Sequence, residues 1–259
     1  MERRALLKLL AASSVSTIAS MAFVPARQTI AKAATIDWNY TGTDGPDNWG
    51  NLSAAYQACQ TGQQQSPIDL EGAIASPHSD LDIVYRPMPL TIQNTGHTIQ
   101  VTAAPGNWVA VDGEPFELQQ FHFHTPSEHI LEHMAYAMEM HLVHQNADGE
   151  LLVLGVFLAE GAENPDLRSL WAAMPPHKSA PRTIPEVKID LLQLLPRDCR
   201  YYFYKGSLTT PPCSERVRWI VLQQSIGVSP AQVAQFQRLF LANARPVQPR
   251  NQRSVFESD

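Results

Sequence analysis

The chain of 259 residues is long enough for one large domain or two small ones. Hydrophobic residues make up 44% of it and charged residues 17%, which is typical of a globular protein and argues against disorder. Its formal net charge is −6, and without the first 33 residues it has 14 basic against 24 acidic side chains. An acidic chain that lacks a cluster of Lys and Arg is a poor candidate for binding nucleic acid or an anionic membrane.

The first 33 residues have the pattern of an export signal. Arg3 and Arg4 precede an uncharged stretch over residues 9–26, and Ala31-Lys32-Ala33 has the form of a cleavage site. The paired arginines resemble a bacterial twin-arginine signal, with an ordinary secretory signal or an uncleaved anchor as alternatives. Serine and threonine make the stretch too polar for a good anchor. We therefore expect residues 34–259 to form one periplasmic or secreted domain, with no stable membrane insertion after cleavage.

The middle of the chain predicts many short strands and few helices. Runs of alternating or apolar residues between turn residues predict strands over residues 90–93, 98–103, 108–111, 116–124, 135–144 and 151–158. One helix is predicted to begin at Asn164-Pro165 and another at Ser229-Pro230, because each pair places a capping residue before a proline at the first helical position. The expected fold class is mostly β with peripheral helices (α+β).

The most informative motif is Gln119-Gln120-Phe121-His122-Phe123-His124, which lies in a predicted strand. Residues two apart in a strand share a face, so the imidazoles of His122 and His124 point the same way. His141 lies in the following predicted strand. Three neutral imidazoles with one open position make a catalytic zinc site, although an isolated H-x-H motif is more often a coincidence.

Strand parity also predicts the neighbours of these histidines. Leu118 and Gln120 should share a face with His122, and Glu139 should share one with His141. A zinc-binding histidine needs an acceptor for its other ring nitrogen, which Gln120 and Glu139 could provide. His144 has the opposite parity to His141 and is expected to be packed and hydrogen-bonded. Three other histidines, His78, His133 and His177, are expected at the surface.

Several long motifs, in the right order, resemble the α-class carbonic anhydrases over roughly residues 37–255. They are residues 38–40, 45–50, 65–69, 94–97, 243–246, Gln120-Phe121-His122-Phe123-His124, Ser127-Glu128-His129, Glu139-Met140-His141-Leu142-Val143-His144 and Gly206-Ser207-Leu208-Thr209-Thr210-Pro211-Pro212-Cys213-Ser214-Glu215. The resemblance implies a large, twisted, mostly antiparallel central sheet. It also implies a lyase that reversibly hydrates carbon dioxide to bicarbonate and a proton.

The resemblance also assigns the chemistry. It implies Zn²⁺ held by His122, His124 and His141, with water or hydroxide as the fourth ligand. Thr209 would orient the hydroxide and Glu128 would orient Thr209. A threonine hydroxyl has one hydrogen, so giving it to Glu128 leaves the oxygen to accept from the hydroxide. The histidine in the Asn94-Thr95-Gly96-His97 motif, His97, would shuttle protons, since its titration range suits that role.

The same resemblance places further residues around the centre. Asn243 would join Gln120 and Glu139 in supporting the ligand histidines, and Thr210 would border the substrate. An apolar wall for carbon dioxide would consist of Val143, Val153, Leu208, Val217 and Trp219. Aromatic sulfonamides should inhibit by replacing the hydroxide. Whether the chain is a monomer or a homodimer is not decided by the sequence.

The three cysteines suit an exported protein with one disulfide, but their number leaves the pairing open. The family resemblance implies a disulfide between Cys59 and Cys213. Cys199 is then expected to be a free thiol, buried or weakly exposed.

Two other functions compete with this interpretation. His122-x-His124 followed by Glu128 also fits the metal motif of a cupin, in which Glu128 would bind the metal directly. The intact stretch around Thr209 disfavours that alternative. A non-catalytic carbonic-anhydrase-like binding domain is the other candidate, but such relatives typically lose a zinc histidine.

Overall fold

The structure is a computed structural model that describes residues 36–76 and 80–258. The signal predicted over residues 1–33 and His78 lie outside the described residues. The strands are β1 (Ile74–Ser76), β2 (Leu81–Val84), β3 (Met88–Asn94), β4 (Ile99–Thr102), β5 (Trp108–Val111), β6 (Glu114–His124), β7 (Ile130–Leu131), β8 (Met134–Ala135), β9 (Met138–Gln145), β10 (Leu151–Glu160), β11 (Arg182–Ile189), β12 (Tyr201–Ser207), β13 (Glu215–Leu222), β14 (Ile226–Val228) and β15 (Phe256–Ser258). The α-helices are α1 (Trp49–Leu52), α2 (Ala58–Thr61), α3 (Arg168–Ala173) and α4 (Pro230–Gln237).

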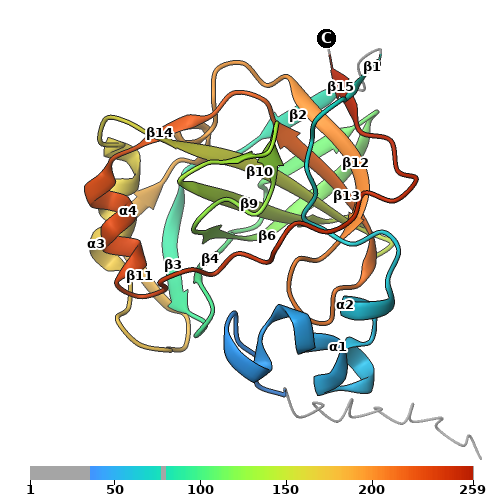
Figure 1. Ribbon diagram of the computed structural model, residues 1–259. Helices are drawn as coiled ribbons and strands as arrows, with labels where there is room; N and C mark the ends of the chain where they lie inside the picture. The colour runs from blue at the N-terminus through green and yellow to red at the C-terminus, as the bar shows by residue number, and fades with distance from the viewer. Residues whose placement is uncertain (1–35, 77–79, 259) are drawn as a thin grey trace, which may run out of the picture. The chain divides into compact units, whose positions relative to one another are not determined.

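A sheet of 13 strands forms the centre of the described domain (Figure 1). Its strands run in the order β1-β15-β12-β13-β10-β9-β6-β4-β3-β11, with β14 beside β10 and the β2–β5 pair beside β6. Most neighbours are antiparallel, and the parallel pairs are β1 with β15, β10 with β13 and β10 with β14. The mostly β fold class and the mostly antiparallel sheet are therefore confirmed.

Most predicted elements are present with small shifts at their ends. The strand predicted over 108–111 is β5, and the one predicted over 116–124 begins earlier, at Glu114. The strand predicted over 135–144 begins only at Met138, because Ala135 belongs to the separate β7–β8 hairpin. The helix predicted at Asn164-Pro165 opens as a 3-10 turn capped by Asn164 and becomes α-helical only at Arg168.

The helix predicted at Ser229-Pro230 is α4, where Ser229 and Gln232 form a reciprocal capping box. In Figure 1, α3 and α4 lie side by side, and the Trp171 indole of α3 donates to the Gln232 carbonyl of α4 at 2.9 Å. The sequence does not predict the edge strand β11, because most of its residues are exposed and Pro185 interrupts the run.

A register shift in β6 reverses one prediction of strand parity. Leu118 pairs with His144 of β9, whereas Gln120 pairs with Val143, so Gln119 is an extra residue between them. Such a β-bulge changes which residues point to each face. Leu118 therefore packs in the same cluster as Phe121, on the face away from His122. The prediction that Leu118 shares the histidine face is wrong for this reason.

Two apolar clusters cover the two faces of the sheet. Leu152 and Val153 are consecutive in β10 and belong to different clusters, so the clusters lie on opposite faces. The larger cluster is covered partly by α3 and α4 through Trp171 and Phe236. The smaller cluster contains Val153 and Trp219 and lies on the face of the histidine motifs.

The predicted disulfide between Cys59 and Cys213 is present, with the two Cα atoms 5.0 Å apart. It joins α2 to the loop between β12 and β13. Cys199 is free, as expected, but it is exposed, which corrects the expectation of a buried or weakly exposed thiol. Its position in the loop just before β12 leaves it at the surface. Among the described residues, no helix is long and apolar enough to cross a membrane.

The double substitution Cys59→Ser, Cys213→Ser should lower the free energy of unfolding by about 3–5 kcal/mol, because the bridge closes a loop of 154 residues. Urea denaturation of the oxidised wild type and the variant would measure the difference. Cys199→Ser is the matched control and should change the unfolding free energy little. An equal loss in the control would contradict the assignment of the stabilisation to the bridge.

Candidate metal centre

Three histidines converge from two neighbouring strands. His122 of β6 and His141 of β9 are direct partners across the antiparallel pair, and His124 lies two residues further along β6. One ring nitrogen from each of the three lies within 4.8 Å of the others. The H-x-H motif and the third histidine are thus brought together as strand parity predicts.

Each of these histidines has its other ring nitrogen occupied. Nδ1 of His122 lies 2.8 Å from Oε1 of Gln120, and Nδ1 of His124 lies 2.7 Å from the Asn243 carbonyl oxygen. Nε2 of His141 lies 2.9 Å from Oε1 of Glu139. These acceptors leave Nε2 of His122, Nε2 of His124 and Nδ1 of His141 free to act as ligands.

The free nitrogens fit a zinc ion. Nε2 of His124 is buried and has no hydrogen-bond partner among the described residues, which would be costly without a ligand. Burial lowers the pKa of His122 well below its ordinary value and also lowers the pKa of His124. Both imidazoles are therefore neutral near pH 7, the form that binds metal. Burial also works to lower the pKa of His141, but the carboxylate of Glu139 outweighs it and raises this pKa, and His141 would have to be neutral to bind a metal. Three imidazoles are the donor set of a catalytic zinc site.

A buried carboxylate, Glu139, organises the surroundings of the centre. Its Oε2 accepts from the backbone N–H groups of Glu128 and His129 at 2.9 and 2.8 Å. Its Oε1 accepts from His141 and from Nδ1 of His129, both within 2.9 Å. Burial works to raise the pKa of Glu139, but the imidazoles of His129 and His141 outweigh it and hold this pKa well below its usual range.

The network continues outward through residues that sequence reasoning did not assign. Nε2 of His129 lies 2.6 Å from the Tyr204 hydroxyl, which lies 2.8 Å from the Ser66 hydroxyl. Because Nδ1 of His129 donates to Glu139, its Nε2 accepts from Tyr204. His129 stands in the quoted Ser-Glu-His motif, but Tyr204 has no local signal in the sequence.

Glu128 and Thr209 are both buried, with exposures of 1% and 5%. Oε1 of Glu128 accepts from the Arg245 backbone N–H at 2.8 Å. Oε2 lies 3.5 Å from Nε2 of His124 and 3.8 Å from Nδ1 of His141, without a hydrogen-bond partner among the described residues. Among the described residues, Thr209 and Glu128 do not form the expected hydrogen bond.

His97 lies in the turn between β3 and β4, next to the amino-terminal segment. Its ring stacks on Trp38 with centroids 3.7 Å apart and planes inclined by 5°. Its Nδ1 is buried and unpartnered within the described structure, and its backbone carbonyl accepts from the Asn243 side chain at 3.0 Å. Partial burial, and next the charge of Lys178, lower the pKa of His97.

The residues expected to form the apolar wall lie together in the smaller cluster. Val153, Val217 and Trp219 are each 1% exposed, and Val143 and Leu208 pack against them. The rings of Trp219 and His141 have centroids 4.8 Å apart, so this cluster adjoins the histidine centre. Thr210 is half-buried in the loop that also carries Thr209.

The other histidines lie away from the centre. His144 is fully buried on the opposite face, where its Nε2 lies 2.8 Å from the Tyr85 hydroxyl. His177 is exposed. His133 is exposed in the β7–β8 turn, and its ring nitrogens lie 2.7 Å from Asp69 and 3.1 Å from Glu71.

Comparison with known proteins now places the chain. Residues 44–259 match the family model of eukaryotic-type carbonic anhydrase. A carbonic anhydrase of Nostoc sp. is 45% identical over 262 residues, which cover 99% of this chain and 97% of the relative. One of Klebsiella pneumoniae is 46% identical over 224 residues, which cover 85% and 90%. The structure of the Thermovibrio ammonificans α-carbonic anhydrase with the inhibitor sulfanilamide has a TM-score of 0.82 and 42% identity, covering 85% of this chain and 99% of that one.

The chain belongs to the eukaryotic-type, or alpha, carbonic anhydrase family. The resemblance drawn from the sequence motifs is thereby confirmed, and the cupin alternative is set aside by both fold and family. Membership supports enzymatic hydration of carbon dioxide as the general activity, in a family that is generally zinc-dependent.

Buried His144 should make stability depend on pH. Burial lowers its pKa from 6.5 to about 3 in the folded state, so the unfolded chain binds the proton more readily between these values. The neutral folded form is thus fully favoured above pH 6.5 and loses stability as the pH falls, by about 1.4 kcal/mol per unit from this residue. Denaturation of wild type and His144→Gln between pH 7 and pH 4 would measure it. If the unfolding free energies of the two proteins changed with pH in the same way, His144 would not be the source of the pH dependence.

Proposed function

We propose that the chain reversibly hydrates carbon dioxide to bicarbonate and a proton at a zinc centre held by His122, His124 and His141. The observation that carries the proposal is the convergence of three imidazoles, each with one ring nitrogen occupied by a hydrogen bond. Zinc bound there would lower the pKa of a water molecule and so supply hydroxide near neutral pH, an effect for which carbonic anhydrases are the reference case.

The surrounding side chains divide the remaining work. Thr209 would accept a hydrogen bond from the nucleophile and donate its own hydrogen to Glu128. These two hydrogen bonds would aim a lone pair of the nucleophile at carbon dioxide. This role requires the Thr209 hydroxyl and Glu128 to come into hydrogen-bond contact when the site is loaded. The buried side chains of Val143, Val153 and Trp219 would hold uncharged carbon dioxide and exclude water.

His97 would relay the proton to solvent. Its lowered pKa favours rapid release of a proton once it has been accepted. The unpartnered Nδ1 is an atom free to hold that proton.

Two further expectations accompany this activity. Aromatic sulfonamides should inhibit this chain, because a relative of similar fold was solved with sulfanilamide. The domain should act in the periplasm or outside the cell, since its disulfide is typical of oxidising compartments.

Metal dependence tests the proposed activity directly. Stopped-flow hydration of carbon dioxide by purified 34–259 should vanish on removal of zinc by a chelator and return when zinc is restored. His122→Ala should lose stoichiometric zinc and activity together, because a ligand is missing. The exposed His177→Ala is the matched control and should retain both. If the folded, zinc-loaded wild type does not hydrate carbon dioxide, the non-catalytic binding domain becomes the better interpretation.

His97→Ala should reduce the turnover number in weak buffer by about one to two orders of magnitude, because the proton relay is lost. Added imidazole should restore the rate by carrying the proton in its place. His133→Ala, which removes an exposed histidine in the β7–β8 turn, serves as the control. If His97→Ala matches wild type without a small-molecule buffer, His97 is not the shuttle.

A further inference from the structure

Glu128 and Thr209, whose alignment the proposed function requires, come from separate parts of the chain. Glu128 lies in the loop that follows β6, and Thr209 lies in the loop between β12 and β13. No hydrogen bond joins the two residues within the described structure. The separation of a buried carboxylate and a buried hydroxyl must therefore be set by what holds each loop.

Arg245 contacts Glu128 and also the segment of residues 59–66. Its backbone N–H donates to Oε1 of Glu128 at 2.8 Å. Its guanidinium donates to the carbonyl oxygens of Cys59 and Ser66, both at 2.8 Å, and to Oε1 of Gln65 at 2.9 Å. The residue is only 2% exposed and stacks over the ring of Trp49 at 5.6 Å.

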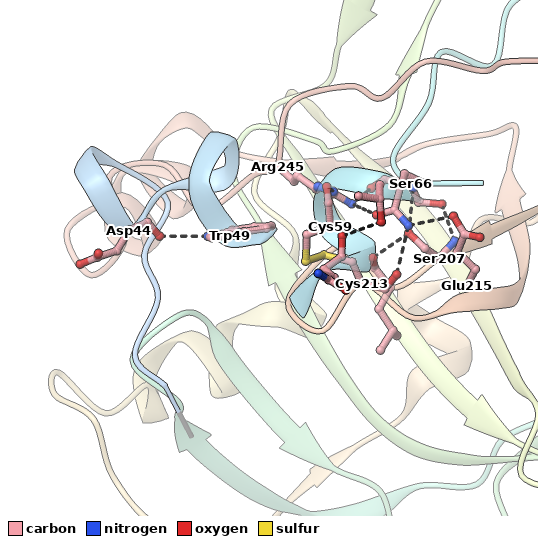
Figure 2. Close-up of a disulfide and its surroundings, with 12 residues drawn as sticks. Asp44, Trp49, Cys59, Ser66, Ser207, Cys213, Glu215 and Arg245 are labelled. Carbon is pink, nitrogen blue, oxygen red and sulfur yellow. Dashed lines mark hydrogen bonds between the residues drawn. A yellow bond between two sulfur atoms is a disulfide. The ribbon is translucent and has the colours of Figure 1, made fainter. Parts of the chain in front are cut away.

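The segment that Arg245 binds is also the anchor of the Thr209 loop (Figure 2). The disulfide joins Cys59 to Cys213, and Nε2 of Gln65 donates to the Cys213 carbonyl oxygen at 3.1 Å. The backbone N–H of Ser66 donates to the Ser207 hydroxyl at 2.9 Å, and the N–H of Ser207 donates to the Ser66 hydroxyl at 3.1 Å. Arg245 therefore connects the Glu128 carboxylate to the base of the loop that carries Thr209.

We propose that Arg245 is a positioning residue for the attack on carbon dioxide. It holds Glu128 and the Thr209 loop in the relative position that the hydrogen bond between Glu128 and Thr209 requires. The inference rests on the proposed function, since it gives these two residues their roles. A planar guanidinium can serve three acceptors in a fixed arrangement, whereas an ammonium is a point charge on a flexible stem. Lysine at this position keeps the backbone N–H to Glu128 and the charge, but it cannot reproduce the three contacts to residues 59–66.

The chain offers a matched control in Arg253. Its guanidinium donates to the backbone carbonyl oxygens of Gln65, Pro249 and Lys205 and stacks over Tyr204 at 5.7 Å. It thus ties the same segment to its surroundings, but it makes no contact with Glu128. Arg253→Lys should lower the stability of the fold, because it loses similar hydrogen bonds to backbone carbonyl oxygens. It should not change the relative position of Glu128 and Thr209.

The test compares Arg245→Lys and Arg253→Lys as zinc-loaded proteins in strong buffer. Arg245→Lys should lower kcat/KM for carbon dioxide roughly tenfold or more at unchanged zinc content, because small misplacements of reacting groups are costly. Added imidazole should not restore it, since the proton relay is intact. Arg253→Lys should keep kcat/KM within about twofold at a comparable fall in the unfolding temperature.

The inference would be overturned if Arg245→Lys kept the kcat/KM of the wild type, or if Arg253→Lys lost as much kcat/KM as Arg245→Lys. Should Arg245→Lys fail to fold, Gln65→Leu decides, because it removes the link from the guanidinium to Cys213 and leaves Arg245 two acceptors. A lowered kcat/KM with full zinc content supports the role of Arg245, and an unchanged one contradicts it. If the wild type did not hydrate carbon dioxide, that result would contradict the proposed function and would not test the positioning role of Arg245.

Discussion

The buried carboxylate of Glu139 is the interaction on which the centre depends. It accepts four hydrogen bonds, two from backbone N–H groups of the loop after β6 and two from the imidazoles of His129 and His141. An ionised carboxylate can be buried only when it is satisfied in this way. These four hydrogen bonds therefore determine the path of the loop that carries Glu128 and leave Nδ1 as the ring nitrogen of His141 that does not contact Glu139.

The sheet makes this arrangement compatible with a stable core. One face of β6 and β9 carries His122, His124 and His141, and the other carries Phe121, Phe123 and Leu142 of the larger apolar cluster. The bulge at Gln119 lets one strand serve both purposes, because Leu118 and Phe121 then point into the same cluster. Rigid strands thus position the three histidines, and the apolar cluster behind them limits their movement.

The groups around the three converging histidines are held differently. Glu128, Thr209 and His97 lie in loops, and each loop is attached to a distant segment of the chain. Arg245 and the Cys59–Cys213 bridge join the Glu128 and Thr209 loops through residues 59–66, while Asn243 contacts both His97 and the loop after His124. The carboxyl-terminal segment therefore links the ligand strands to the loops that surround them.

The sequence by itself determined that His122, His124 and His141 converge and which strands carry them, because the faces of a strand follow from a local period of two. Gln120 and Glu139 were predictable for the same reason, and the long motifs revealed the family. Only the tertiary structure decided the reversed face of Leu118, the exposure of Cys199 and the contacts of Arg245, Tyr204 and Trp38. These depend on a bulge and on contacts between residues up to 186 positions apart, which no local pattern encodes.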